Sequence, residues 1–226
     1  MNRENNGLSP PGAVTPANDV NASPVKDSGL VLASSSPRRR QLLGYLGLEF
    51  EVMPSDFEEV VDESLTPAEV VVDLAIAKAQ EIAARIVAST RGASVVLGAD
   101  TVVVLDGRVI GKPASRQQAA EMLTQLSGRC HEVYTGVALV ELPGGRVTSA
   151  HQVSKVYMRT IAPGEIRAYV ETGEPMDKAG AYALQGIGSV FVEKIEGCFT
   201  NIIGLPIPLV VQLLRGCGFE ILGWPL

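Results

Sequence analysis

Apolar and polar positions along the chain follow two periods, one typical of helices and one typical of strands. Over residues 67–87 the apolar side chains recur every three to four positions, and Thr66 with Glu69 forms a capping box in front of them. Cap, proline and glycine signals predict four further helices. These begin near residues 37, 116, 163 and 208, and the last three end near residues 126, 172 and 215.

Short apolar runs and alternating segments between these helices predict strands. They cover residues 29–33, 94–99, 101–105, 132–141, 147–159, 189–195 and 219–222. Helices and strands alternate, yet some strands are joined by tight turns, as at Asp106-Gly107. This mixture predicts a single α/β domain over residues 29–226, with helices packed on a mixed sheet. Residues 1–28 are rich in Asn, Pro, Ser and Gly, and we expect them to form a disordered N-terminal tail.

Composition narrows the set of partners. The 226-residue chain has a formal net charge of -6, which argues against nucleic acid as a partner but allows a local basic patch for a small anion. Its three cysteines are widely spaced and it has two histidines, so carboxylates would have to bind any metal, which favours Mg²⁺ or Mn²⁺ over zinc. No apolar run approaches the ~18 residues of a membrane span. We expect a cytoplasmic protein with no membrane partner.

The stretch LASSSPRRRQLL, residues 32–43, places three serines, a proline and three arginines where a strand passes into a helix. One interpretation is a solvated helix face on an acidic protein. The other is an anion site, because free N–H groups at a helix N-terminus attract phosphate and arginine binds it in a bidentate way. Taken alone, this stretch favours the solvated face.

Four more stretches carry polar groups that a hydrophobic core does not need. They are SDFEE at residues 55–59, GADT at 98–101, GKP at 111–113, and DKAGAY at 177–182 with the Gln-Gly that follows. The structural alternatives are a solvated loop for SDFEE, a turn aspartate for Asp100 and, for the isolated cation Lys78, a side chain that reaches to water. Together these groups supply carboxylates for a divalent metal and a water, and cations for phosphate oxygens. This inventory favours an enzyme that acts on a phosphate ester or a nucleotide.

The motifs LASSSPRRRQLL, GADTVVV, GKP, DKAGAY and IIGLP follow one another in the order and spacing of a known family. Through them, residues 29–222 resemble the Maf family of nucleoside triphosphate pyrophosphatases. The resemblance implies one α/β domain with an elongated mixed sheet, similar to the inosine triphosphatase fold. It also implies a cleft that binds a nucleoside triphosphate and a divalent cation, and commonly a homodimer.

The same resemblance assigns roles to individual residues. Asp100 matches the family's catalytic proton acceptor, and Glu59 its partner carboxylate at the metal and the water. Two lysines match the cations that face the triphosphate, and three residues match the phosphate-binding loop: Lys78 and Lys112, and Ser34, Arg38 and Arg39. The implied reaction is attack of a metal-activated water on the α-phosphorus, which yields the monophosphate and pyrophosphate.

Three positions separate a subgroup of this family that acts on dTTP and UTP from one that acts on 7-methyl-GTP. Here they are Arg38, Thr101 and Gln185, and all three match the pyrimidine subgroup. We therefore expect a dTTP/UTP pyrophosphatase, with modified pyrimidine triphosphates as further candidate substrates. Two alternatives stay open: a pyrophosphatase of the 7-methyl-GTP type, and a nucleotide-binding regulator of septum formation and cell division.

Overall fold

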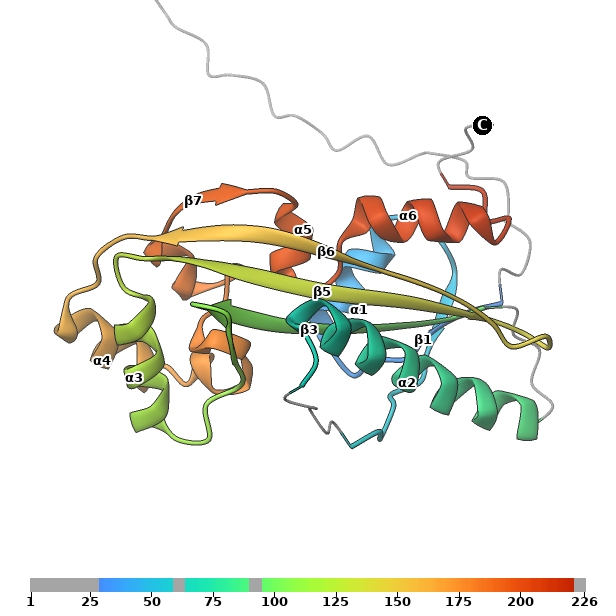
Figure 1. Ribbon diagram of the computed structural model, residues 1–226, viewed down its shortest axis with the longest axis horizontal. Helices are drawn as coiled ribbons and strands as arrows, with labels where there is room; N and C mark the ends of the chain where they lie inside the picture. The colour runs from blue at the N-terminus through green and yellow to red at the C-terminus, as the bar shows by residue number, and fades with distance from the viewer. Residues whose placement is uncertain (1–28, 59–63, 90–94, 222–226) are drawn as a thin grey trace, which may run out of the picture.

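The computed structural model describes residues 29–58, 64–89 and 95–221, which form one elongated domain (Figure 1). Its strands are β1 Leu30–Leu32, β2 Phe50–Val52, β3 Val95–Leu105, β4 Arg108–Ile110, β5 Cys130–Glu141, β6 Arg146–Met158 and β7 Val192–Glu196. Its α-helices are α1 Pro37–Gly44, α2 Pro67–Ala88, α3 Arg116–Leu126, α4 Pro163–Glu171, α5 Phe199–Ile203 and α6 Ile207–Gly216. Three short 3-10 helices are η1 Glu174–Asp177, η2 Ala179–Ala181 and η3 Ile187–Phe191.

The strands form one mixed sheet of seven in the order β2-β1-β3-β5-β6-β7, with β4 paired to β3 off this path. Strand β1 runs parallel to both of its neighbours, and the other pairings are antiparallel. The long β3, β5 and β6 give the domain its elongated shape (Figure 1). The predicted fold class, an α/β domain with a mixed sheet flanked by helices, is confirmed. None of the helices in the described ranges is long and apolar enough to cross a membrane.

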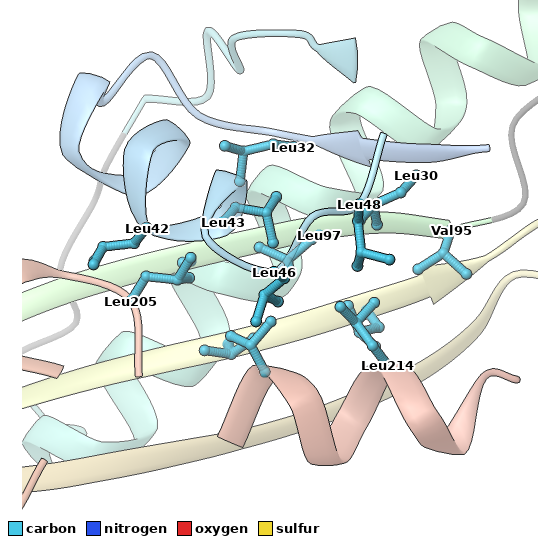
Figure 2. Close-up of a cluster of buried hydrophobic side chains, with 14 of the residues drawn as sticks. Leu30, Leu32, Leu42, Leu43, Leu46, Leu48, Val95, Leu97, Leu205 and Leu214 are labelled. Carbon is cyan, nitrogen blue, oxygen red and sulfur yellow. The ribbon is translucent and has the colours of Figure 1, made fainter. Parts of the chain in front are cut away.

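Helices cover both faces of the sheet, and alternate strand residues point to each. Leu30 and Leu32 of β1 pack with Leu97 and with Leu214 of α6 in the largest cluster (Figure 2). Val31, between them, packs on the opposite face with the alanine-rich side of α2. A second large cluster, under α3 and α4, fills the other end of the domain. Alternation along the strands separates the cluster under α2 from the other two, which follow one another along the same face of β3: Val95 and Leu97 belong to the first and Val103 and Leu105 to the second.

One predicted strand starts too early, a second is absent over its described residues, and the turn interpretation of Asp100 is wrong. Residues 189–191 belong to η3, because the Ser189 N–H donates to the carbonyl of Gly186 and closes a turn before β7 begins. Residues 219–221 are not a strand, because the N–H of Phe219 donates to Leu214 and closes the end of α6. Asp100, which the turn interpretation placed between two strands, lies within the uninterrupted β3.

Two glycines bring α2 unusually close to the centre of the sheet. A Cβ atom on Gly98 of β3 would lie 2.2 Å from the carbonyl oxygen of Ala75, and one on Gly136 of β5 would lie 2.1 Å from that of Val71. These two carbonyls are one helical turn apart on α2. The helix backbone therefore rests directly on the sheet, and its next turn carries Lys78 over β3.

We predict that Gly136→Ala lowers the free energy of unfolding by on the order of 3 kcal/mol, because the atoms that it meets are backbone and cannot move aside. Urea denaturation measures the change. Gly144→Ala is the matched control, since a Cβ there meets nothing within 4 Å, and we expect it to change stability by less than about 0.5 kcal/mol. Equal stabilities of the two variants would contradict the close packing of α2.

A buried histidine of β5 supports a tyrosine of the Gly-rich segment. His131 is 2% exposed, and its Nε2 lies 2.8 Å from the hydroxyl of Tyr182. Its Nδ1 is buried without a hydrogen-bond partner in the described part of the chain. Burial lowers the pKa of His131 from 6.5 to about 4, because the imidazolium form would lose its hydration. His131 is therefore neutral in the folded protein near neutral pH.

This shift predicts a loss of stability in mild acid. Between pH 6.5 and about 4 the unfolded chain binds a proton at residue 131 that the folded chain does not, so the free energy of unfolding falls as the pH drops. Over the whole pH range, protonation of residue 131 in the unfolded chain lowers the free energy of unfolding by about 3 kcal/mol. In His131→Gln a polar amide that does not titrate takes the place of the imidazole beside Tyr182. The free energy of unfolding of this variant should therefore fall less between pH 6.5 and about 4. Parallel pH profiles of the two proteins would contradict the assignment.

Candidate active site

A gap along one edge of β3 is the starting point of the site. Strand β1 pairs with residues 95–97 of β3, and β4 pairs with residues 103–105. Between these two pairings, residues 98–102 of β3 pair with β5 along the opposite edge of the strand. Consecutive strand residues point to opposite faces of a sheet. At this open edge, however, Asp100 and Thr101 both reach the same cleft, one from each face.

The cleft has a volume of about 530 Å³ and draws its walls from distant parts of the chain. The β1–α1 junction, α2, β3 and the end of α5 form one part of the lining, and the segments around η1 and η2 form another. Every predicted site residue within the described ranges lines it: Ser34, Arg38, Arg39, Lys78, Asp100, Thr101, Lys112 and Gln185. Glu59 lies outside the described residues, so its predicted place at the metal stays a prediction.

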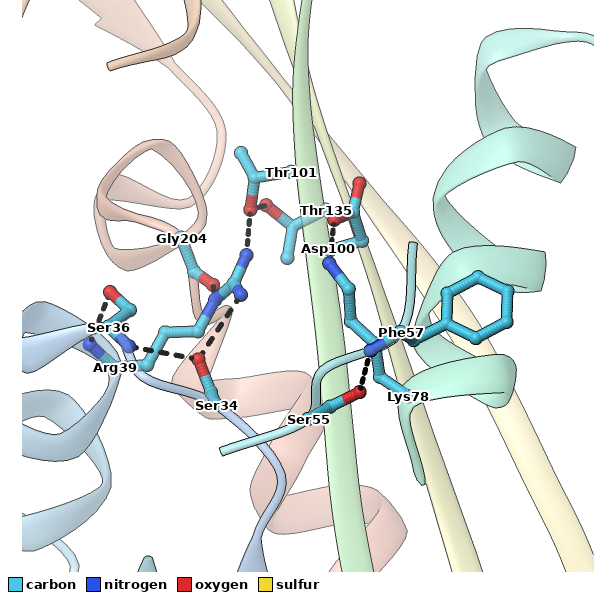
Figure 3. Close-up of polar contacts among 10 residues, drawn as sticks. All are labelled: Ser34, Ser36, Arg39, Ser55, Phe57, Lys78, Asp100, Thr101, Thr135 and Gly204. Carbon is cyan, nitrogen blue, oxygen red and sulfur yellow. Dashed lines mark hydrogen bonds and ion pairs between the residues drawn. The ribbon is translucent and has the colours of Figure 1, made fainter. Parts of the chain in front are cut away.

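Lys78 and Asp100 form a buried ion pair across the α2–β3 contact. Lys78 Nζ lies 2.6 Å from Asp100 Oδ1, and the two residues are 9% and 6% exposed (Figure 3). An ionised carboxylate in the middle of a strand is costly unless a partner compensates its charge. Lys78 therefore does not reach out to water, and Asp100 is not a turn residue: each compensates the other at the wall of the cleft.

Arg39 connects three elements that enclose the cleft. Its Nε donates to the carbonyl of Gly204 at 2.8 Å, and its Nη2 donates to Thr101 Oγ1 at 3.0 Å. Its Nη1 donates to Ser34 Oγ at 3.4 Å (Figure 3). The chain of contacts continues from Thr101 Oγ1 to Thr135 Oγ1, 2.9 Å away. The guanidinium thus ties the start of α1 to β3 and to the end of α5.

The helix start expected after the serine stretch is confirmed. Ser36 is the N-cap of α1, with its Oγ accepting from the N–H of Arg39 at 3.4 Å, and Pro37 occupies the first turn. Ser34 Oγ accepts in turn from the N–H of Ser36. These contacts fix the backbone of residues 34–36, which line the cleft.

Cations outnumber carboxylates along the described lining. Arg38, Lys112 and Lys178 join Arg39 and Lys78, whereas the carboxylates are Asp100 and Asp177. Partial burial raises the pKa of Asp177, but its hydrogen bond with Lys178 and the charges of Lys178 and Arg38 lower it by more, so the net pKa lies below the usual value. A cleft with this balance is suited to a polyanionic ligand.

Lys178 is a cation of the cleft that was not among the predicted site residues. It belongs to the DKAGAY segment, where Gly180 adopts a positive φ of 70° and packs against Val103. That segment stood out for its polar groups in a glycine-rich context, so the signal was present. The sequence alone did not show that the fold places Lys178 in the wall of the cleft.

The donors around the cleft fit a hard divalent cation that shares its coordination with a substrate. The described residues contain no group of three or more His, Cys, Asp or Glu side chains that could hold a metal by themselves. Mg²⁺ is usually bound by one or two carboxylates together with substrate phosphates rather than by an all-protein cage. Asp100 supplies such a carboxylate, and its Oδ1 accepts a hydrogen bond from Lys78 Nζ.

Comparison with known proteins gives related chains that align with this one over nearly their whole length. A protein of Pelotomaculum thermopropionicum named dTTP/UTP pyrophosphatase is 48% identical over 193 residues, which cover 85% of this chain and 98% of that one. A protein of Moorella thermoacetica with the same name is 50% identical over 196 residues, covering 87% and 98%. Among solved structures, the Staphylococcus aureus Ham1 protein aligns with a TM-score of 0.45 and 15% identity, covering 83% of this chain and 98% of that chain.

The family assignment rests on the match to a family model as well as on these relatives. The model described as Maf, Maf-like protein, matches residues 29–217, which include all of the predicted site residues. The predicted resemblance is confirmed: this chain is a member of the Maf family.

Proposed function

We propose that the protein is a pyrophosphatase that hydrolyses dTTP and UTP to the monophosphate and pyrophosphate. The relatives that carry this name align over nearly their whole length at 48% and 50% identity. The observation that carries the proposal is the buried Asp100, with its paired Lys78, in a cleft whose other charged groups are mainly cations. A site that only bound a triphosphate would not need a general base, the role that Asp100 can fill.

The cations of the cleft would bind the phosphate chain. Arg38, Lys112 and Lys178 line the cleft together with the N-terminal end of α1, whose backbone N–H groups favour phosphate oxygens. Arg39 would act mainly by holding the cleft walls, since its three nitrogens donate to Gly204, Ser34 and Thr101. The triphosphate would thereby be oriented before the reaction begins.

The reaction step needs a proton acceptor near the α-phosphorus. A water molecule attacks this phosphorus, the bond from it to the oxygen that bridges to the β-phosphorus breaks, and pyrophosphate leaves. Asp100 accepts the proton of the water on a carboxylate oxygen, and Lys78 compensates the carboxylate charge until then. The cations offset the charge that develops on the phosphate oxygens.

A divalent cation, Mg²⁺ or Mn²⁺, is part of the proposal. Asp100 would hold it together with the substrate phosphates and, by the family resemblance, with Glu59. When bound, it would polarise the phosphate oxygens and lower the pKa of a bound water. The expected homodimer and the cytoplasmic location also stay predictions that follow from the resemblance and the composition.

The direct test is pyrophosphate release by the purified protein. UTP and dTTP should be hydrolysed with Mg²⁺ or Mn²⁺, and a chelator should abolish the activity. Asp100→Asn should lower turnover by about 10²–10⁴-fold, the usual contribution of a general base. Because this variant leaves Lys78 without its partner, turnover is expressed per folded molecule, as measured by circular dichroism at the assay temperature.

Asp73→Asn is the control for this variant, since Asp73 is an exposed aspartate on α2. It should keep the turnover of the unchanged protein. An Asp100→Asn variant that is folded and fully active would refute the role of Asp100. Binding of UTP without any release of pyrophosphate would favour the nucleotide-binding regulator instead.

Base preference is tested at Gln185, which is exposed in the cleft wall. An amide can accept from the N3–H of uracil and donate to a neighbouring carbonyl, whereas a carboxylate can only accept. We therefore predict that the unchanged protein prefers UTP to 7-methyl-GTP, and that Gln185→Glu reduces kcat/KM for UTP by about tenfold. A higher kcat/KM for 7-methyl-GTP in the unchanged protein would overturn the pyrimidine assignment, although not the pyrophosphatase activity.

A further inference from the structure

Glu174, which does not line the cleft, accepts hydrogen bonds from three other residues. The hydroxyl of Tyr169 donates to Oε1 at 2.9 Å, the N–H of Gly188 donates to Oε1 at 2.9 Å, and the N–H of Ile187 donates to Oε2 at 3.0 Å. Partial burial raises the pKa of Glu174, but the N–H groups and the hydroxyl lower it by more, so the net pKa lies below the usual value. The carboxylate therefore stays ionised at neutral pH and joins α4 to the start of η3.

Tyr169 extends this connection to the other end of the same loop. Its buried hydroxyl accepts the N–H of Ala183 at 3.1 Å while donating to Glu174. The loop of residues 183–188 is thus held at its first residue through Tyr169 and at its last two residues by Glu174 directly. We call Glu174 and Tyr169 the loop anchor.

The loop of residues 183–188 packs tightly against the loop anchor. A Cβ atom on Gly186 would lie 2.5 Å from Glu174 Oε2, and one on Gly188 would lie 2.6 Å from the hydroxyl of Tyr169. The glycines allow the backbone to press directly on both side chains of the anchor. A small change in the anchor would therefore shift the backbone of the loop.

The residue that the loop presents to the cleft is Gln185, flanked there by Ala183 and Leu184. Its exposed side chain has little packing to hold it, so its position follows that of the backbone. The segment that precedes the loop has contacts of its own, because the N–H of Lys178 donates to the carbonyl of Pro175 and Lys178 Nζ contacts Asp177. The charge of Lys178 also acts on Glu174 and contributes to its lowered pKa, but Lys178 takes part in none of the hydrogen bonds that hold the loop of residues 183–188 to Glu174 and Tyr169. A change in the anchor is therefore expected to affect Gln185 more than Lys178.

We propose that Glu174 is a positioning residue, which fixes the 183–188 loop so that Gln185 selects the base of the nucleotide. The inference rests on the proposed function, because it concerns the base preference of the same cleft. Glu174 acts through Gln185 and touches neither the substrate nor the reacting atoms. Its removal should weaken recognition of the base and leave recognition of the phosphate chain intact.

The test is Glu174→Gln. The amide keeps the shape of the side chain, but its NH₂ group would face an N–H of Ile187 or Gly188, so one hydrogen bond becomes a repulsion. We expect KM for UTP to rise about tenfold with kcat changed by less than threefold, and the preference for UTP over GTP to narrow by a similar factor. Inhibition by inorganic tripolyphosphate, which has no base, should keep its inhibition constant.

Two matched variants separate this role from a general loss of structure. Glu171→Gln, at the exposed end of α4, removes only an ion pair with Arg116 and should change none of these constants. Tyr169→Phe removes the hydroxyl that joins Glu174 to Ala183 and should shift KM and base preference in the same direction as Glu174→Gln. An unchanged UTP preference in Glu174→Gln, or an equal loss of tripolyphosphate inhibition, would overturn the proposal.

Hydrogen exchange reports on the anchor without any turnover. The amide protons of Ile187 and Gly188 should exchange faster in Glu174→Gln than in Glu171→Gln, and equal exchange rates would count against the anchor. If the unchanged protein released no pyrophosphate, the proposed function would fail. Equilibrium binding of UTP and GTP to the same variants would then decide whether Glu174 sets the base preference of the cleft.

Discussion

The direct contact of α2 with the sheet is the constraint on which the rest of the site depends. Gly98 and Gly136 remove the side chains that would hold the helix away, and the carbonyls of Ala75 and Val71 occupy that space. The same approach brings Lys78 Nζ within 2.6 Å of the Asp100 carboxylate. Without that cation, an aspartate in the middle of a buried strand would carry an uncompensated charge, which costs several kcal/mol. The close packing of α2 on the sheet therefore also creates the Lys78–Asp100 ion pair.

The interrupted pairing along β3 explains how a strand residue becomes available for chemistry. In a fully paired sheet, Asp100 and Thr101 would face separate layers. Because β1 ends its pairing at Leu97 and β4 begins at Val103, the edge between them opens to a cleft that both side chains reach. Arg39 then closes the far wall by joining α1, β3 and α5. Asp100, the proposed proton acceptor, thus has rigid support on one side and faces the cleft on the other.

Much of the fold could be predicted from local patterns. The Thr66 capping box, the proline starts of α1 and α2, and the Asp106-Gly107 turn act within a few residues, and the structure has each of them. At residues 189–191 a distant residue contributes to the difference from the prediction. Residues 189–191 alternate like a strand, but Glu174 holds the N–H groups of Ile187 and Gly188 and the chain turns there instead.

The candidate site shows the same division between local and distant information. Most of the polar residues that line the cleft could be selected from short motifs in the sequence, and Lys78 as an isolated cation in an apolar helix. The contacts that these residues make with distant parts of the chain could not be predicted from the motifs. The pairing of Lys78 with Asp100 spans 22 positions, and the bond from Arg39 to Gly204 spans 165. The support that Glu174 gives to the loop of Gln185 likewise depends on the fold, since no motif marks it.

In the proposed reaction, the cleft directs water to the α-phosphorus of a pyrimidine nucleoside triphosphate. Hydrolysis of UTP in water enriched in ¹⁸O, followed by mass spectrometry of both products, shows which phosphorus the water attacks. Attack at the α-phosphorus places the label in UMP and leaves the released pyrophosphate unlabelled. Label in the pyrophosphate, or release of inorganic phosphate in its place, would mean attack at another phosphorus and would contradict the account.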